Sequence, residues 1–390
     1  MSYPLASSSW DHEEYEAIQA VIASGMFSMG PKVAEFEAAF AQYTNSRYCV
    51  MVNSGSSANL LMVGALRYRK ADAFLPGDEV IVPAVSWSTT YYPLYQYGLK
   101  LKFVDIDKDT LNYDLEQLAA AVTDKTRAIM VVNLLGNPND FSRIREIIGE
   151  RKIEILEDNC ESMGATFEGR QAGTHGLMGT FSAFFSHHIS TMEGGMIVTN
   201  DEELYHILLS LRAHGWTRNL PKHNHVSGTK SDDAFVESFR FMLPGYNVRP
   251  LEMSGAIGIA QVKKLPEMVS KRRDNARRFL DIVARYPYLR PQKEIGESSW
   301  FGFSMILEKD APYDRSSLVQ EFNARKIDVR PIVAGNFAKN EVLRWFDYSI
   351  SGTLHNAEEI DHSGLFIGNH HYDLGAELEH FAAALANLHG

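Results

Sequence analysis

The sequence predicts an α/β protein whose central sheet is mostly parallel and is covered by helices on both faces. Two observations carry this prediction. Short apolar runs alternate with helix-like segments through the first two thirds of the chain, which is typical of parallel sheets. The chain has 390 residues, 45% of them hydrophobic and 22% charged, which is enough for one large domain and a smaller one.

Strands are expected where short apolar runs end at polar turns, and helices where apolar residues recur at helical spacing. The first helix begins at Asp11 with acidic residues in its first turn, a typical helix start. The expected strands cover residues 48–52, 79–83, 102–106, 128–133, 154–157 and 196–199, and one more begins at Gly179. The expected helices cover residues 11–24, 31–43, 58–68, 90–97, 115–122, 141–148, 202–213, 250–264 and 265–286.

The chain is expected to divide into a large domain, residues 1–285, and a small C-terminal α/β domain, residues 286–390. The last helix of the large domain would link the two, and the N-terminal segment is expected to pack back on the small domain. Strands near residues 301–307 and 327–330 and helices near 315–325 and 375–388 are expected in the small domain.

Charge and cysteine content exclude several classes of protein. The net charge of −11 argues against nucleic acid or an anionic membrane as a partner. No apolar run is long enough to span a membrane, and the start of the chain lacks a secretory signal pattern, so a cytoplasmic location is expected. Two cysteines, Cys49 and Cys160, are too few for a disulfide framework or an iron–sulfur cluster, and no metal site is expected.

Ser56 and Ser57 lie in the turn between an expected strand and the helix that follows it. Free amides, hydroxyl groups and the positive end of a helix dipole together suit a phosphate group. The alternative is an ordinary helix cap, since serine is a preferred capping residue.

Asp158, Glu161 and Trp87 follow the ends of two other expected strands. Ligands bind at the carboxyl ends of parallel strands, so these side chains are candidates for a binding site. The alternatives are a turn cap for Asp158 and a core position for Trp87.

The segment from Gly179 to Gly195 reads as a strand, a turn containing His187 and His188, and a Gly-Gly pair before the next strand. It resembles the lysine-bearing segment of the sugar-aminotransferase (DegT/DnrJ/EryC1/StrS) family of fold type I pyridoxal-phosphate (PLP) enzymes. Ser182 and Glu193 bracket His187 with the spacing at which that family brackets its lysine. No lysine occurs from residue 153 to residue 221.

The resemblance covers most of the chain and implies roles for the residues above. In it Asp158 holds the pyridine nitrogen of PLP protonated, Trp87 stacks on the ring, and Glu161 stands where the family usually has glutamine, near the phenolic oxygen. Asn247 would reach the phosphate in a neighbouring subunit, which implies a homodimer with shared active sites. The remaining cofactor contacts implied are Ser56, Ser57 and Ser182, and the implied substrate contacts are His214, Arg218 and Arg249.

The histidine, together with the runs at residues 83–93 and 134–138, resembles the lysine-lacking dehydratase branch of this family. That branch removes the C3 hydroxyl of GDP-4-keto-6-deoxy-D-mannose in dideoxysugar synthesis, as in colitose formation. The resemblance implies non-covalent PLP, which L-glutamate converts to pyridoxamine phosphate (PMP), with ammonia released at the end. A sister branch for CDP-sugars needs an iron–sulfur centre and a reductase, which two distant cysteines disfavour.

His187 is predicted to be the catalytic base. Its reference pKa of about 6.5 leaves much of it neutral near pH 7, whereas the pKa of a lysine would have to fall by about three units. Imidazole also cannot form an imine, which favours deamination over amine transfer. His188 is the alternative base, since a shift of one residue would exchange the two. The alternative functions are an inactive sugar-nucleotide-binding regulator, an aminotransferase that recruits another lysine, and action on another nucleotide 4-ketosugar.

Overall fold

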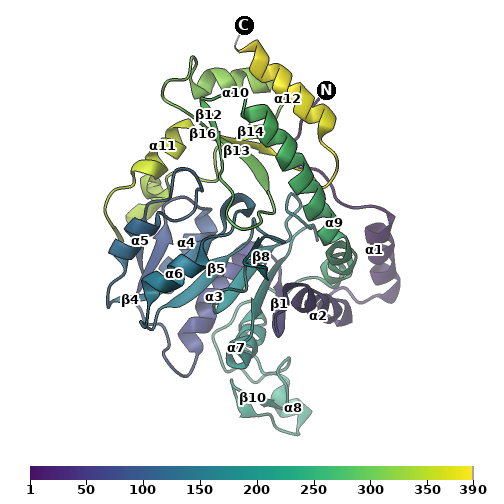
Figure 1. Cartoon of the computed structure of the whole chain (residues 1–390). Helices are drawn as coiled ribbons and strands as arrows, with labels where there is room; N and C mark the ends of the chain where they lie inside the picture. Colours follow the sequence, from purple (N-terminus) through teal and green to yellow (C-terminus); the bar gives the residue numbers. More distant parts are fainter. Residues whose placement is uncertain (389–390) are drawn as a thin grey trace.

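The computed structural model describes residues 1–388 and has the predicted α/β architecture (Figure 1). Over those residues an eight-stranded sheet runs in the order β1-β9-β8-β5-β4-β2-β3-β15. Neighbouring strands from β8 to β15 are parallel, while β9 is antiparallel to both β1 and β8. The strands are β1 Tyr48–Val52, β2 Glu79–Pro83, β3 Lys100–Val104, β4 Thr126–Val132, β5 Glu154–Asp158, β8 Met178–Ser182, β9 Gly195–Thr199 and β15 Tyr348–Ile350.

Alternate residues of the central strands pack on opposite faces of this sheet, as a period of two requires. Val80 and Val82 of β2 belong to a core formed with α3, α4 and α7. Ile81 lies in the core formed with α5 and α6, and a third core joins α2 and α9 to β1, β8 and β9. The helices are α2 Pro31–Thr44, α3 Gly55–Tyr68, α4 Ser88–Gln96, α5 Leu115–Ala121, α6 Phe141–Ile148, α7 Glu202–Arg212 and α9 Glu252–Val283.

A second, antiparallel sheet, β12-β13-β16-β14, lies beyond the end of α9. Its core includes Phe279 of α9 and Tyr3, whose backbone pairs with Ile327. The N-terminal residues and the last helix, α12, lie beside this sheet in Figure 1. Its elements are β12 Leu289–Pro291, β13 Gly302–Leu307, α10 Arg315–Ala324, β14 Val329–Arg330, α11 His355–Ser363, β16 Gly364–Gly368 and α12 Gly375–Asn387, while α1 His12–Ser24 packs on α9.

The elements differ from the sequence-based expectation in two main places. The helices expected over residues 250–264 and 265–286 are one continuous helix, α9, which passes through Pro266. The expected strand at residues 102–106 is β3, two residues earlier. The boundary between residues 285 and 286 stays a prediction, and β15 crosses it by pairing with β3 of the large sheet. Among the described residues, no helix combines the length and apolarity needed to cross a bilayer.

The buried carboxylate of Glu252 joins α9 to the start of α2. It accepts hydrogen bonds from the backbone amides of Gly30 at 2.6 Å, Lys32 at 2.6 Å and Val33 at 3.3 Å. The N-cap of α2 is Gly30, which has no side chain to cap the helix. Glu252 therefore satisfies the free amides at this helix start in place of a capping residue.

Replacing Glu252 by alanine is expected to lower the free energy of unfolding by roughly 2–4 kcal/mol, because three donors lose a charged partner. Urea unfolding of Glu252→Ala and wild type measures the difference. The exposed Glu16 of α1 provides a control, since Glu16→Ala should change the value by less than about 0.5 kcal/mol. Equal stability of Glu252→Ala and wild type would contradict this role.

Candidate active site

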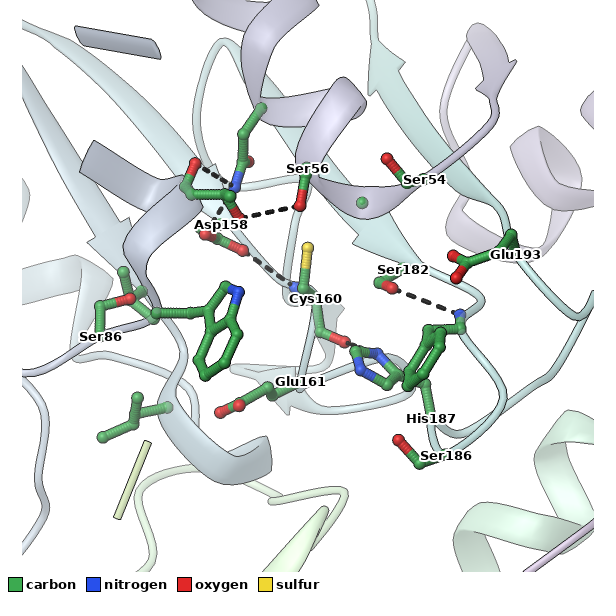
Figure 2. Close-up of a pocket in the computed structure, with 17 residues that line it drawn as sticks. Ser54, Ser56, Ser86, Asp158, Cys160, Glu161, Ser182, Ser186, His187 and Glu193 are labelled. Carbon is green, nitrogen blue, oxygen red and sulfur yellow. Dashed lines mark hydrogen bonds between the residues drawn. The ribbon is translucent and has the colours of Figure 1, made fainter. Parts of the chain in front are cut away.

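A cavity of about 390 Å³ lies at the carboxyl ends of the parallel strands (Figure 2). Residues that follow β1, β2, β4, β5 and β8 all reach it, which is where open parallel sheets bind ligands. Eight residues were expected to bind the cofactor or to act as the base, and six of them line this one cavity. They are Ser56, Trp87, Asp158, Glu161, Ser182 and His187.

The start of α3 forms one wall of the cavity. Ser54 is the N-cap and accepts a hydrogen bond from the amide of Ser57 at 3.1 Å, so Ser57 serves the cap and does not line the cavity. A side chain at Gly55 would lie 2.6 Å from Cβ of Ser182, so only glycine fits there. Exposed Ser56 completes a polar turn at a helix start, which suits a phosphate group.

Asp158 ends β5 on the floor of the cavity, and its carboxylate is held by three donors. Asn59 Nδ2 donates at 2.8 Å and Thr90 Oγ1 at 2.7 Å to Oδ2, while the amide of Cys160 donates to Oδ1 at 3.2 Å. Asn59 is itself fixed by the hydroxyl of Thr180 at 2.6 Å. This network holds a negative charge in one orientation beside the cavity.

Trp87 lies at the N-cap of α4, and 58% of the residue is exposed. The core position considered for it is therefore wrong. The neighbouring Ser86 is buried and contacts Thr90 at 2.8 Å, which anchors the loop while the indole stays free. An exposed indole on a cavity wall offers a flat face for stacking.

His187 lines the cavity and is held by a backbone carbonyl. Its Nδ1 lies 2.9 Å from the oxygen of Cys160, and because a carbonyl can only accept, Nδ1 carries the proton. The Nε2 atom of that tautomer is the basic nitrogen. Edge-to-face contacts with Phe184 and Phe301 fix the ring. Burial lowers the pKa of His187 to about 4, with the charge of Arg272 contributing in the same direction, so the imidazole is neutral at pH 7.

His188 points elsewhere. It is buried outside the cavity lining, and its Nε2 lies 3.2 Å from the carbonyl oxygen of Ser299. Burial lowers the pKa of His188 well below its usual value. Of the two adjacent histidines, His187 is the one placed beside the cavity.

Glu161 lies three residues after Asp158 and lines the same cavity. Its Oε2 accepts a hydrogen bond from the amide of Leu135 at 3.0 Å. Burial raises the pKa of Glu161 to about 7, and the charge of Asp158 adds to the rise. The carboxyl group is therefore partly protonated near neutral pH, unlike an ordinary glutamate.

Four predicted residues lie outside this cavity, on or beside an exposed arm, residues 216–242, that extends past α7 in Figure 1. Arg218 and Arg249 both stack on the ring of Trp216, at 4.1 and 5.4 Å from its centre. Arg249 Nε donates to Oδ1 of exposed Asn247 at 3.0 Å, and His214 contacts Trp216 edge-on. The loop expected over residues 216–235 contains β10 His223–Asn224, β11 Gly228–Thr229 and α8 Ala234–Glu237.

The cavity carries negative but no permanent positive charge. Asp158, Glu161 and Glu193 line it, and none of its lining residues in the described part of the chain is lysine or arginine. Across residues 1–388 no group of three or more His, Cys, Asp or Glu side chains is arranged to hold a metal ion.

Sequence reasoning missed the residues that hold the predicted ones. Cys160 orients His187 through its carbonyl, and Asn59 and Thr90 orient Asp158. A backbone carbonyl has no sequence signal. The polar residues Asn59 and Thr90 are recognisable only by their position on the inner turns of α3 and α4, facing the end of β5.

The chain matches the family model of the DegT/DnrJ/EryC1/StrS aminotransferase family over residues 8–386. It is 62% identical over 386 residues to GDP-4-keto-6-deoxy-D-mannose 3-dehydratase of Escherichia coli O55:H7. This match covers 99% of this chain and 100% of that protein. An enzyme of the same name from Yersinia pseudotuberculosis is 61% identical, over 97% of each chain.

Solved structures agree with these matches. The E. coli dehydratase with bound hydrated PLP superposes with a TM-score of 0.98, at 62% identity over 99% of each chain. A dehydratase with a trapped PLP-glutamate geminal diamine gives 0.97, at 62% identity over 98% of this chain and all of that one. In a third structure, lysine replaces a histidine and asparagine replaces the serine directly before it. This structure superposes with a TM-score of 0.96, at 61% identity over 97% of this chain and all of that one.

Proposed function

This chain belongs to the DegT/DnrJ/EryC1/StrS aminotransferase family, and we propose that it is a PLP-dependent dehydratase acting on GDP-4-keto-6-deoxy-D-mannose. In this proposal L-glutamate supplies the amino group, and the products are GDP-4-keto-3,6-dideoxy-D-mannose and ammonia. One observation carries the proposal. His187 lines the cavity in the segment that resembles the family's lysine-bearing segment, and its Nδ1 is held by a backbone carbonyl, which leaves Nε2 ready to accept a proton.

The substituted histidine in the third solved structure supports the same position. It directly follows a serine in that protein. In this chain a histidine directly follows a serine only at Ser186 and His187, and both line the cavity. His187 is therefore the base in the proposal, and His188 is not.

The residues present fit PLP. The start of α3, with Gly55 too crowded for any other residue, would hold the phosphate together with Ser56 and Ser182. Asp158 would hold the pyridine nitrogen and keep it protonated, and Trp87 would cover the ring face. When bound, PLP supplies an electron sink for bonds broken next to the imine carbon.

The neutral Nε2 of His187 accepts the proton released when substrate and cofactor react. Its hydrogen bond to Cys160 keeps that nitrogen facing the cavity before and after the transfer. Imidazole forms no imine and cannot displace the nitrogen that glutamate delivered. Hydrolysis therefore releases this nitrogen as ammonia. A lysine in the same place would displace it as an amino sugar.

Incubation with PLP, L-glutamate and GDP-4-keto-6-deoxy-D-mannose tests the function, with the sugar identified by mass spectrometry. The proposal predicts a keto sugar lighter by one oxygen atom, together with ammonia and 2-oxoglutarate. An amino sugar would show an aminotransferase instead. Tight binding of the nucleotide sugar with no change in its mass would show a binding protein, and either result would overturn the proposal.

We also propose a homodimer whose active sites are shared. The phosphate of PLP and the diphosphate of GDP are anions, yet among residues 1–388 no lysine or arginine lines the cavity. Arg218 lies on the exposed arm, and Arg249, bonded to Asn247, stacks on Trp216 of the same arm. The apolar residues Phe235 and Phe239 of the arm are 88% and 68% exposed. The arm of a second copy would supply the missing positive charge. A cytoplasmic location completes the proposal, since Cys49 and Cys160 are both free.

Mixed dimers test the sharing of sites. A dimer of one His187→Asn chain and one Asn247→Ala chain should regain about half of the wild-type activity, because two-fold symmetry leaves one site with both native residues. Differently tagged chains allow the mixed dimer to be purified, and the two mutant homodimers are the controls. A mixed dimer no more active than the mean of those homodimers would contradict shared sites.

A further inference from the structure

Glu161 lines the cavity from the turn after β5. Beyond the contact with the phenolic oxygen of PLP that the resemblance implies, the mechanism above gives its carboxyl group no part in the reaction. We propose that Glu161 is the acid of the reaction, which gives its proton to the departing C3 hydroxyl group while His187 acts as the base. This inference rests on the proposed function of the same site.

The position of the carboxyl group is fixed by a rigid turn, η1 (Leu134–Gly136). The amide of Leu135 binds Oε2, and Leu135 has a left-handed backbone, φ 54°. That conformation is stabilised from both sides, since Leu135 oxygen accepts from the amide of Phe301 at 3.0 Å and Leu134 donates to Oδ1 of Asn112 at 3.4 Å. One oxygen of Glu161 is thus anchored while the carboxyl group points into the cavity (Figure 2).

The acid and the base are held by neighbouring parts of the same turn. Cys160, the residue before Glu161, accepts the Nδ1 hydrogen of His187. Figure 2 shows both side chains reaching the cavity from this turn and from the loop after β8. His187 and Glu161 therefore line the same cavity, each bound to a different backbone group, and the described residues show no hydrogen bond between the two side chains. Each can keep its own protonation state.

The charges around the two groups push them in opposite directions. Burial lowers the pKa of His187 to about 4, and the nearby Arg272 favours its neutral form. Burial raises the pKa of Glu161 to about 7, and Asp158 favours its protonated form. The usual order of a carboxylic acid and an imidazole is thus reversed, and a pair with separated pKa values is the pattern of an acid and a base. Glu193 and Cys160 are the other titratable groups that line the cavity.

The step is a balanced loss of water. His187 takes a proton from carbon, and the electron pair left behind enters the conjugated system that ends at C3. The C3–O bond breaks with its electron pair on oxygen, and the proton of Glu161 completes a water molecule. Glu161 is left as a carboxylate and His187 as an imidazolium, and exchange with solvent restores both.

Glu161→Gln is the matched test, because an amide oxygen still accepts from Leu135 while the side chain can no longer carry a proton. The first readout needs no turnover. The absorption spectrum of PLP bound to full-length wild type is expected to titrate with a midpoint near pH 7, and this step should be absent in Glu161→Gln. Glu161→Asp should shift the step without removing it, and Glu193→Gln, at another cavity carboxylate, should keep it. The same midpoint in wild type and Glu161→Gln would overturn the proposal.

The second readout is kcat against pH. Wild-type kcat should fall as pH rises through about 7, since the acid must be protonated, and Glu161→Gln should lose between about 10² and 10⁴ in kcat with little change in KM. Wild-type kcat in Glu161→Gln would overturn the proposal and leave His187 with both proton transfers. If wild type eliminates no water at all, the proposed function fails, and the PLP titration still decides whether Glu161 carries a proton in the cavity.

Discussion

His187→Asn is expected to lower the elimination rate by a factor of about 10²–10⁴, which is the contribution of one positioned acid–base group. The substitution removes the basic Nε2 atom. The asparagine amide can still donate a hydrogen bond in the direction of the Cys160 carbonyl, so the turn after β5 should keep its shape. PLP binding should persist, because Asp158, Ser56 and Ser182, which would hold the cofactor, are unchanged.

Two measurements check this expectation: the rate of sugar product formation by mass spectrometry, and retention of PLP absorbance after gel filtration. His188→Asn is the matched control one residue away. His188 is buried outside the cavity lining. Its replacement should therefore lower the melting temperature but leave the turnover of the folded protein close to that of wild type. Normal turnover by His187→Asn would show that this imidazole is not the base.

Asp158→Asn is expected to reduce turnover by about 10²–10³, the usual loss when a fixed charge that stabilises a transition state is removed. The carboxylate accepts from Asn59, Thr90 and Cys160 and keeps a negative charge at the end of β5. An amide there would turn its NH₂ group towards one of these donors, and it could not hold a protonated pyridine nitrogen. The cofactor would bind less tightly and would be a weaker electron sink.

Turnover and PLP affinity of Asp158→Asn should be compared with those of Glu154→Gln, at the other end of the same strand. Glu154 pairs with Arg69 far from the cavity and should be neutral for catalysis. Turnover of Asp158→Asn within a few-fold of wild type would refute the role of Asp158.

The fold could be predicted from the sequence because each strand is short, apolar and followed by a polar turn. The site could be predicted because those turns meet at one edge of a parallel sheet. Asp158 and Ser182 end adjacent strands, so two motifs that are 24 residues apart in sequence lie side by side. This convergence is a property of the parallel sheet and not of any single motif.

Other features had no local signal. Two helices were expected over residues 250–264 and 265–286, yet α9 is one continuous helix that includes Pro266 and packs along α1 and α2. The strand β15 joins the large sheet from a distant part of the chain, and a pairing so remote in sequence cannot be read from periodicity. The raised pKa of Glu161 and the lowered pKa of His187 depend on burial by η1 and on Arg272, which are tertiary contacts.

The most direct test of a non-covalent cofactor beside His187 is borohydride reduction followed by the intact mass of the denatured protein. Wild type loaded with PLP is expected to show the mass of the bare chain, because it has no lysine from residue 153 to residue 221 to form a reducible bond in the cavity. His187→Lys, treated in the same way, should gain the mass of one reduced cofactor. A stoichiometric PLP adduct on wild type, or none on His187→Lys, would contradict the account.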